Sequence, residues 1–275
     1  LRRSLQVRTH QDFGSLVHRI EPVRTFGDLI VSSEVQVQLK EILSAIRQRE
    51  GVLNRGFGHK LGRATGISAL FYGESGTGKT MTAEVLAGEL GVDLIQIDLS
   101  AVVNKYIGET EKHLAKIFDL AERDCGVLFF DEADALFGKR TATQDSHDRH
   151  ANIEVSYLLQ RLEQHPGLVI LSTNNRANLD TAFNRRITFM TRFSMPDASM
   201  RERMWQAIWP HALALSDAID FADLARRVEI TGSNIRNVAL LATWLAAEDE
   251  ARCVELRHLE QALKREMGKL GKIYS

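Results

Sequence analysis

The sequence predicts an α/β protein in which a parallel sheet lies between layers of helices and is followed by a small all-helical domain. From Ser68 onward, short apolar runs alternate with helical patterns, which is typical of a parallel sheet with crossover helices. After Pro196 the strand-like runs stop, and apolar residues recur at helical spacing. We therefore expect a basic linker or helix over 1–25, an α/β domain over 26–195 and a helical domain over 196–275.

The individual elements are expected where the apolar residues recur. The strands are expected at 69–72, 94–97, 127–130 and 168–171, with a weaker one within 187–193. The helices are expected at 80–90, 111–123 and 179–184, and then at 200–209, 221–228, 234–247 and 256–267. The polar segment 138–152 has no such pattern, so we expect a long mobile loop there.

The composition is that of an ordinary globular protein and argues against some classes of function, though only weakly against nucleic-acid binding. The chain has 275 residues, 44% hydrophobic and 26% charged, enough for one α/β domain and a smaller companion. Its formal net charge of -1 provides no general basic field for DNA or an anionic membrane. No apolar run approaches the roughly 18 residues that cross a membrane. The cysteines, Cys125 and Cys253, suit reduced thiols in the cytoplasm.

The first residues raise a question of targeting. Residues 1–20 contain four arginines and a single acid, Asp12, which is the bias of an organelle transit peptide. The sequence begins with Leu1 rather than methionine, as a fragment of a longer protein would. We favour a basic linker or docking helix and a cytoplasmic location, and a transit peptide is the alternative.

Residues 73–80 form the pattern of a phosphate-binding loop. They read Gly-Glu-Ser-Gly-Thr-Gly-Lys-Thr, between an expected strand and an expected helix, which is the context that the pattern requires. Glycines let the backbone turn its N–H groups toward phosphate oxygens, and the helix N-terminus adds partial positive charge. We expect Lys79 on the terminal phosphates of a nucleotide and the Thr80 hydroxyl on Mg²⁺. A glycine-rich turn formed by chance is the alternative.

An adjacent pair of carboxylates ends the third expected strand. Asp131 and Glu132 follow the apolar run 127–130, so both should lie at the carboxyl edge of the sheet, beside the phosphates. We expect Asp131 to hold the magnesium shell and Glu132 to orient and deprotonate the attacking water. The alternative is an acidic pair that caps the next helix, but the independent phosphate loop favours the catalytic interpretation.

Polar residues beyond the fourth expected strand complete the pattern. Asn174 is a candidate for helping Glu132 to position the water, and a simple strand-end turn residue is the alternative. Arg185 and Arg186 follow an expected helix that carries the chain away from the site, so we expect them to reach a neighbour's γ-phosphate instead of their own. A finger of this kind raises the rate by roughly 10³–10⁵. The alternative is that the two arginines form a solvated basic turn. If they act as a finger, the protein must form a ring or filament to work.

In this order and at these spacings, the four elements resemble the classical AAA family of ring-forming ATPases. The resemblance covers about residues 25–272. It implies a P-loop three-layer sandwich, the AAA+ nucleotide-binding domain, over 26–195 and a helical lid domain over 196–275. It also implies ATP and Mg²⁺ as cofactors and a homo-oligomer, by family analogy a hexameric ring.

Two further segments resemble the family's contacts to the adenine. Residues 25–29 resemble the segment that flanks the base, and residues 231–236 resemble the glycine-centred contact made by the small domain. The nucleotide-binding residues that the resemblance implies are Asp28, Leu29, Gly73, Glu74, Ser75, Gly76, Thr77, Gly78, Lys79, Thr80, Met81, Gly232 and Ser233.

Residues 105–109 resemble the family's first pore loop, in which an aromatic residue grips a polypeptide threaded through the ring. The resemblance implies that Tyr106 is the gripping residue and that Lys105 and Ile107 flank it. An ordinary loop aromatic is the alternative.

Several segments also resemble a bacterial AAA group that is often encoded beside phage-tail-like contractile injection particles. They are 56–61, 105–114, 129–140, 145–149 and 151–154. This narrower resemblance implies an assembly or remodelling role around such particles. The chain departs from the wider family where Arg185 and Arg186 are adjacent instead of separated by Pro-Gly. It departs again at Asn234, where some relatives carry a phosphate-sensing arginine, so a second sensor within the chain is in doubt.

Three functions fit these residues. The first is a ring-shaped ATPase that pulls on or remodels a protein substrate, which the aromatic pore loop favours. The second is a nucleic-acid motor or loader with the same ATPase site. It predicts basic side chains lining the pore, for which Lys105 and Lys112 offer some support. The third is a nucleotide-gated scaffold, against which the full catalytic set counts. We expect a protein substrate and no membrane insertion, and a role for nucleic acid is disfavoured.

Overall fold

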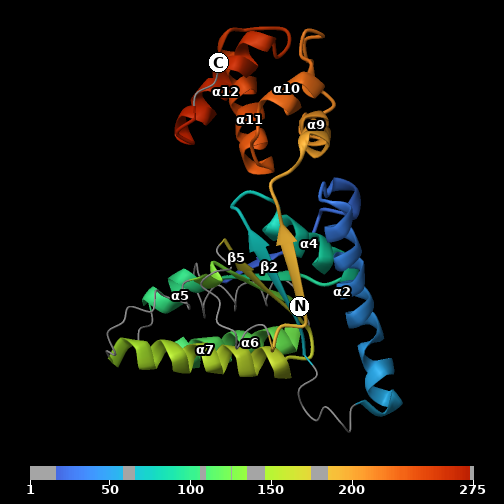
Figure 1. The fold of residues 1–275 in the computed structure, drawn as a ribbon, viewed down its shortest axis with the longest axis vertical. Helices are drawn as coiled ribbons and strands as arrows, with labels where there is room; N and C mark the ends of the chain where they lie inside the picture. Colours follow the sequence, from blue (N-terminus) through green and yellow to red (C-terminus); the bar gives the residue numbers. More distant parts are fainter. Residues whose placement is uncertain are drawn as a thin grey trace. The chain divides into compact units, whose positions relative to one another are not determined.

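The computed structural model describes residues 17–57, 66–105, 110–124, 126–134, 146–174 and 185–272 (Figure 1). These residues form two compact units. The first takes the described parts of Leu1–Leu29, Ser33–Glu74 and Lys79–Phe193. The second takes the described parts of Ile30–Ser32, Ser75–Gly78 and Ser194–Ser275.

The first unit contains a mostly parallel sheet. In the described part of the chain it has six strands, in the order β1-β3-β4-β5-β2-β6, and only the β1–β3 pair is antiparallel. The bounds are β1 Val17–Ile20, β2 Ile67–Gly73, β3 Leu94–Asp98, β4 Val127–Asp131, β5 Leu168–Thr173 and β6 Phe189–Phe193. Strands β2 to β6 lie at the positions that the apolar runs predicted, which confirms the α/β fold class.

Strand β1 corrects the prediction for the N-terminal segment. Residues 1–25 were expected to form a linker or helix, but Val17–Ile20 pairs with β3 and extends the sheet. Val17 is buried in the core, and the Arg19 Nε atom donates to the Asp93 carboxylate at 2.5 Å. Four residues are too few for an alternating pattern to stand out, so pairing with β3 rather than local sequence defines this strand.

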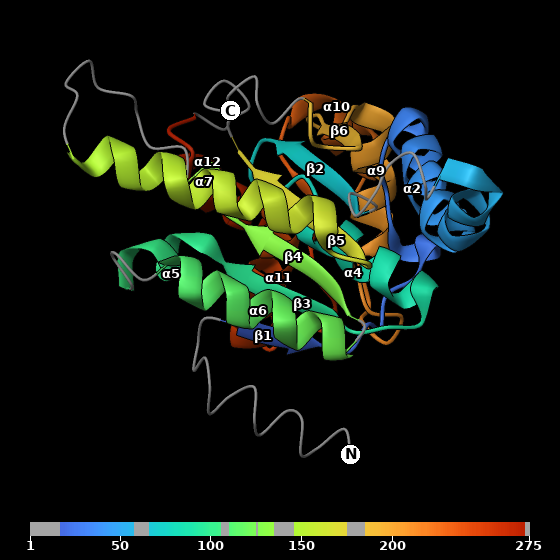
Figure 2. The same cartoon turned by 90° about the horizontal axis from the view of Figure 1, so that it is seen from below.

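Helices cover both faces of the sheet. Helices α6 (Thr110–Asp124) and α7 (Ser146–Gln164) lie side by side on one face (Figure 2). Helices α2 (Ser33–Val52) and α4 (Lys79–Leu90) contact each other and strands of the sheet. The remaining helices of this unit are η2 (Phe26–Asp28), η3 (Leu53–Phe57) and α5 (Leu99–Lys105).

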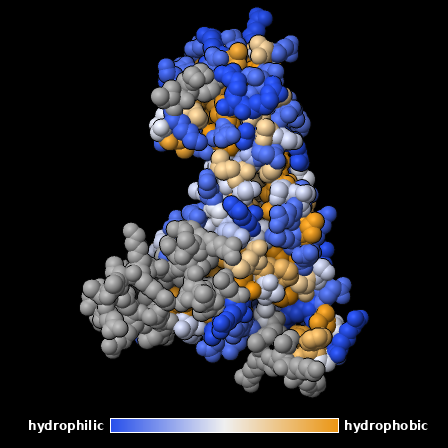
Figure 3. Space-filling model, in the orientation of Figure 1, coloured by the Kyte–Doolittle hydropathy of each residue, from blue (hydrophilic) through white to orange (hydrophobic). Residues whose placement is uncertain are grey.

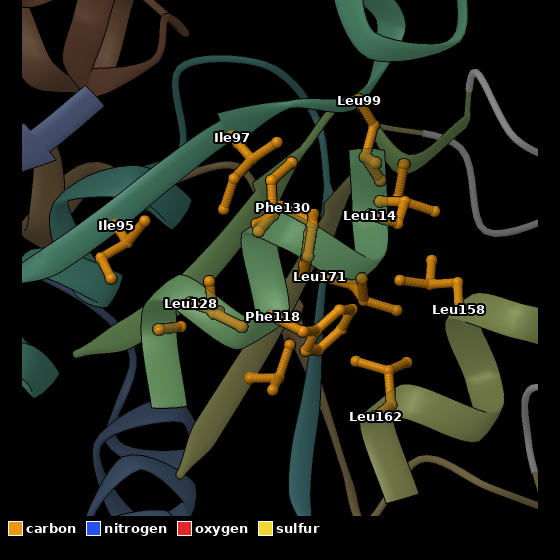
Figure 4. Close-up of a cluster of buried hydrophobic side chains, with 14 of the residues drawn as sticks. Ile95, Ile97, Leu99, Leu114, Phe118, Leu128, Phe130, Leu158, Leu162 and Leu171 are labelled. Atoms are coloured by element: carbon orange, nitrogen blue, oxygen red, sulfur yellow. The ribbon is translucent and has the colours of Figure 1, made fainter. Parts of the chain in front are cut away.

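The sheet strands are apolar throughout because both faces are covered. On the face under α6 and α7, the Phe118 ring packs against Phe130 with centroids 5.5 Å apart, and Leu158 and Leu162 complete this cluster (Figure 4). On β4, the neighbouring residue Phe129 is also fully buried but lies outside this cluster. Successive strand residues point to opposite faces, so the second face is buried as well.

Helix α7 corrects a second prediction. The segment 138–152 was expected to be a loop, but residues 146–152 are helical, and 135–145 lie outside the described residues. Leu158 and Leu162 bury the C-terminal half of α7 in the core. Once a helix is nucleated, each added residue costs little, so the helix continues into a polar sequence that shows no periodicity of its own.

The second unit is a small helical bundle. Its helices are α9 (Ala198–Ala207), α10 (Phe221–Arg227), α11 (Gly232–Glu248) and α12 (Leu256–Lys269). Side chains of Asp197, Asp220 and Thr231 cap the first N–H groups of α9, α10 and α11, which ends each preceding loop sharply. The Trp205 ring is fully buried and stacks with Phe221 in the core of this bundle.

The surface is largely hydrophilic on the face shown in Figure 3, apart from scattered apolar residues. Among the helices that the structure describes, none has the length and apolarity needed to cross a membrane.

His165 is a buried titratable group in the first unit. Its ring packs edge-on against Phe118, and within the described residues neither ring nitrogen has a hydrogen-bond partner. Burial, with the charges of Arg161 and Arg49, lowers the pKa of His165 to about 4. The neutral ring is therefore favoured in the folded chain, whereas the unfolded chain takes up a proton near pH 6.5.

We predict that this difference makes the fold sensitive to acid. The contribution of neutral His165 is fully present above about pH 6.5 and is lost as the pH falls toward 4. The loss reaches about 2–3 kcal/mol at pH 4.5. His165→Leu should therefore lose less unfolding free energy between pH 7 and pH 4.5 than the native chain, measured by urea denaturation. His211→Leu, at an exposed position, is the substitution control. Equal losses for the native chain and His165→Leu would contradict the prediction.

Candidate functional site

The predicted phosphate loop connects β2 to α4. Gly73 ends β2 with a φ of 144°, and Gly76 and Gly78 have φ values of 78° and 99°. Residues that have a side chain rarely adopt these φ values, so the turn requires glycine. A side chain on Gly73 would also collide with the carbonyl oxygen of Phe193 on the neighbouring strand. The loop therefore bends as tightly as the sequence pattern predicted.

Lys79 is the first residue of α4 and is buried. Its ammonium group donates to the carbonyl oxygens of Gly73 at 2.7 Å and Glu74 at 2.9 Å, and to Asn174 Oδ1 at 2.9 Å. Burial lowers the pKa of Lys79, while the charges of Asp131 and Asp134 oppose this shift. The cation is thus fixed between the start of the loop and the tip of β5. Thr80 and Met81 follow it, half-buried in the first turn of α4.

The two predicted carboxylates lie at the carboxyl end of β4, but in different environments. Asp131 pairs in register with Asp98 of β3, and its Oδ2 atom accepts from Gln96 Nε2 at 3.5 Å. Glu132 is exposed and has a φ of 52°. This left-handed conformation costs a residue with a side chain about 1–2 kcal/mol. Such strain is found most often at functional sites, so it agrees with a catalytic role for Glu132.

The tip of β5 brings Asn174 next to the loop. Since β5 lies between β4 and β2 in the sheet, its end lies next to the ends of both strands, and Asn174 contacts Lys79. Asp134, after β4, accepts from the Thr173 hydroxyl and from the backbone N–H of Asn174. Burial raises the pKa of Asp134, although these hydrogen bonds and the charge of Lys79 oppose it. The sequence analysis missed Asp134, although its place in the acidic run after β4 was a usable signal.

The arginine pair lies at the other end of β2. Arg185 and Arg186 are exposed, and the Ser68 hydroxyl donates to the Arg186 carbonyl oxygen at 3.2 Å. The Arg186 Nε atom lies 3.5 Å from Glu163 Oε1. Ser68 and Gly73 are about 16 Å apart at the ordinary rise of a strand. The structure therefore brings Lys79, Asp131, Glu132 and Asn174 together but keeps the arginine backbone away from them.

The predicted adenine contacts fall in both units. In the first, Asp28 accepts from the N–H of Thr25 at 2.8 Å and from its hydroxyl at 2.9 Å, which lowers the Asp28 pKa, and Leu29 is buried. In the second, Gly232 begins α11, and the N–H of Ser233 donates to Gly76 O at 3.3 Å. These contacts give Asp28 a local capping role and place Ser233 beside the loop residues of its own unit.

Asn234 has structural partners in the second unit. Its Oδ1 atom accepts from the Thr231 hydroxyl at 2.6 Å, and its Nδ2 atom donates to Glu266 Oε1 at 2.9 Å. Both polar atoms of the Asn234 amide therefore have partners within the second unit.

The predicted pore loop begins at the end of α5. Lys105 is the last residue of α5, and Tyr106 and Ile107 lie outside the described residues.

Comparison with known proteins identifies the family. Residues 69–195 match the ATPase family associated with various cellular activities (AAA). The chain is 32% identical over 243 residues to an uncharacterized AAA family ATPase, y4kL, of Sinorhizobium fredii, covering 87% of this chain. It is 30% identical over 266 residues to cell division protein C of Sulfolobus acidocaldarius, covering 90% of this chain and 68% of that relative. The chain belongs to the AAA family.

A third AAA relative is proteasome-activating nucleotidase 2 of Halobacterium salinarum, which is 29% identical over 252 residues and covers 89% of this chain. The chain spans 66% of the length of the Sinorhizobium protein and 60% of this one, less than two thirds of each. Membership of this ATPase family indicates that the chain binds and hydrolyses ATP.

The side chains at this AAA site fit ATP and a hard divalent cation. A desolvated ammonium group and a loop of left-handed glycines suit the charge and shape of a polyphosphate. Mg²⁺ is usually held by one or two carboxylates together with phosphate oxygens, for which Asp131 and the Thr80 hydroxyl are candidates. The cation would neutralise charge on the phosphates. To bind a phosphate, Lys79 must exchange at least one of its acceptors for a phosphate oxygen.

We predict that Glu132→Gln separates ATP binding from hydrolysis. Glutamine keeps the size and the left-handed conformation but cannot take a proton, so the turnover rate should fall by about 100-fold or more. The affinity for ATP and the melting temperature should stay close to those of the native chain. Titration with a fluorescent ATP analogue and a phosphate-release assay measure the two quantities. A variant that hydrolyses ATP at the native rate would contradict the role of Glu132.

Proposed function

We propose that this AAA ATPase assembles into a ring, six-membered by family analogy, and uses ATP hydrolysis to remodel or thread a protein substrate. The observation that carries the proposal is the place of Arg185 and Arg186 at the amino end of β2. They are exposed, and the chain's own phosphate loop lies at the carboxyl end of the same strand. An arginine side chain is too short to cross this distance, so the pair is suited to a neighbour's ATP.

The proposed reaction uses residues that lie at or beyond the carboxyl ends of three neighbouring strands, β4, β5 and β2. Lys79 binds the terminal phosphates, and Thr80 with Asp131 would hold Mg²⁺ against them. Glu132 takes the proton of the attacking water, and Asn174 orients that water from the tip of β5. The neighbour's arginines then stabilise the negative charge that develops on the transferred phosphoryl group.

A protein substrate is supported by the relatives and by the sequence. One relative is named a proteasome-activating nucleotidase. The pore-loop resemblance at Lys105, Tyr106 and Ile107 supplies a way to grip a polypeptide. An aromatic side chain contacts many different sequences because its interaction is apolar and requires no fixed hydrogen bond.

We propose, more narrowly, that the protein has an assembly or remodelling role around contractile injection particles. Only the sequence resemblance of segments such as 56–61 and 145–149 supports it. If it holds, the Glu132→Gln chain should capture a particle component in the presence of ATP, identified by mass spectrometry. If the variant captures only unrelated soluble proteins, the role around such particles is wrong, and the proposal of a ring is unaffected.

We predict that two inactive variants restore each other's activity. Arg185→Ala/Arg186→Ala should lower turnover by roughly 10³-fold, and Glu132→Gln by about 100-fold or more, since each removes one part of a shared site. When the two are mixed, a site with native Glu132 can receive arginines from a Glu132→Gln neighbour. The ATPase rate of the mixture should therefore exceed the sum of the separate rates, and the native rate per chain should rise with protein concentration.

The matched control is a second exposed arginine pair. Arg226 and Arg227 on α10 pair with Asp223 at 3.5 and 3.2 Å. Their replacement by alanine should leave the ATPase rate unchanged. If the Arg185→Ala/Arg186→Ala chain keeps native activity, or if mixing restores nothing, the shared site and the ring proposed from it are wrong.

A further inference from the structure

Asp134 and Thr173 form a contact that the proposed reaction does not use. Asp134 lies in the turn after β4, and Thr173 is the last residue of β5. The Thr173 hydroxyl donates to Asp134 Oδ1, and the Thr173 side chain is buried. The contact ties the turn that carries Glu132 to the tip of the next strand.

The same carboxylate also holds the next residue. The backbone N–H of Asn174 donates to Asp134, so two consecutive residues at the tip of β5 depend on one acceptor. The Asn174 side chain then accepts from Lys79 at 2.9 Å. A continuous set of contacts therefore runs from Asp134 through Asn174 to Lys79.

We propose that Asp134 is a positioning residue for ATP hydrolysis, which fixes the tip of β5 so that the Asn174 amide is held between Lys79 and the attacking water. The inference rests on the proposed roles of Lys79 and Asn174. Asn174 follows the last residue of β5 and lies beyond the register of the pairs that β5 makes with β2 and β4, so its amide depends on contacts other than strand pairing. Two hydrogen bonds to a charged acceptor restrict that motion more strongly than neutral bonds would.

A purely structural role predicts a different outcome. A capping carboxylate that only stabilises its turn would change the melting temperature and leave the turnover rate of the folded chain unchanged. A positioning role changes the chemical step, because misplacing a group by about 1 Å can cost about 100-fold in rate. Binding of ATP should change much less, since Lys79 and the phosphate loop stay in place.

The test compares Asp134→Ala, Asp134→Asn and Thr173→Val for kcat, for ATP affinity and for melting temperature. Asp134→Ala should lower kcat by about 10- to 100-fold, as removal of a supporting hydrogen-bond partner does at other sites. Asp134→Asn keeps one oxygen acceptor and should recover part of the loss. Thr173→Val keeps the shape of the side chain, removes the hydroxyl donor and should give an intermediate kcat. ATP affinity should change far less than kcat in all three.

Two controls make the assignment specific. Asp98 lies at the same edge of the sheet and accepts from the Ser100 hydroxyl at 2.7 Å and the Ala101 N–H at 3.0 Å, so it is a carboxylate of matched type. Asp98→Asn should leave kcat unchanged. In an Asn174→Ala chain, the further change Asp134→Ala should add little, because the residue that it positions is already gone.

The outcomes distinguish a failure of the role of Asp134 from a failure of the proposed role of Asn174. If Asn174→Ala is inactive while Asp134→Ala and Thr173→Val keep native kcat, Asp134 does not position Asn174, and the proposed function stands. If the losses at Asp134 and Asn174 simply multiply, Asp134 acts elsewhere and the inference is wrong. If Asn174→Ala keeps native kcat, the proposed role of Asn174 fails and takes the inference with it.

Discussion

The site depends on one buried cation. Lys79 donates to the carbonyl oxygens of Gly73 and Glu74 and to the amide of Asn174, so a single ammonium group connects the end of β2, the start of α4 and the tip of β5. Its burial lowers its pKa, and nearby Asp131 and Asp134 compensate. A desolvated charge that is already held in place interacts strongly with a phosphate, because little water screens it.

The sheet topology explains why these groups meet. Strands β4, β5 and β2 are neighbours and parallel, so their carboxyl ends lie together at one edge. This edge collects Asp131, Glu132, Asn174 and the phosphate loop. The same topology sends the chain after β5 back to the amino end of β2, where Arg185 and Arg186 lie. One arrangement of strands therefore brings Lys79, the acidic pair and Asn174 together and leaves the arginines at the opposite end of β2.

Much of this could be predicted from the sequence, and the exceptions have physical reasons. Runs such as 127–130 are apolar on both faces, so the strands and the residues at their ends were found. Strand β1 was missed because its four residues are defined by pairing with β3 and show no pattern of their own. The polar start of α7 was assigned to a loop because helix continuation leaves no apolar signature. Asp134 stood in the acidic run after β4, but its contact with Thr173 could not be predicted, because Thr173 is close only after the sheet forms.

The most direct test of this account is the affinity for Mg²⁺–ATP of the native chain and of Lys79→Met, measured by isothermal titration. Methionine keeps the length of the side chain and removes the charge, so affinity should fall by about 10- to 100-fold while the chain stays folded. Lys40→Met, on the exposed side of α2, is the control and should bind ATP as the native chain does. Equal affinities for the native and Lys79→Met chains would show that the buried ammonium group does not hold the nucleotide, and the account of the site would have to be abandoned.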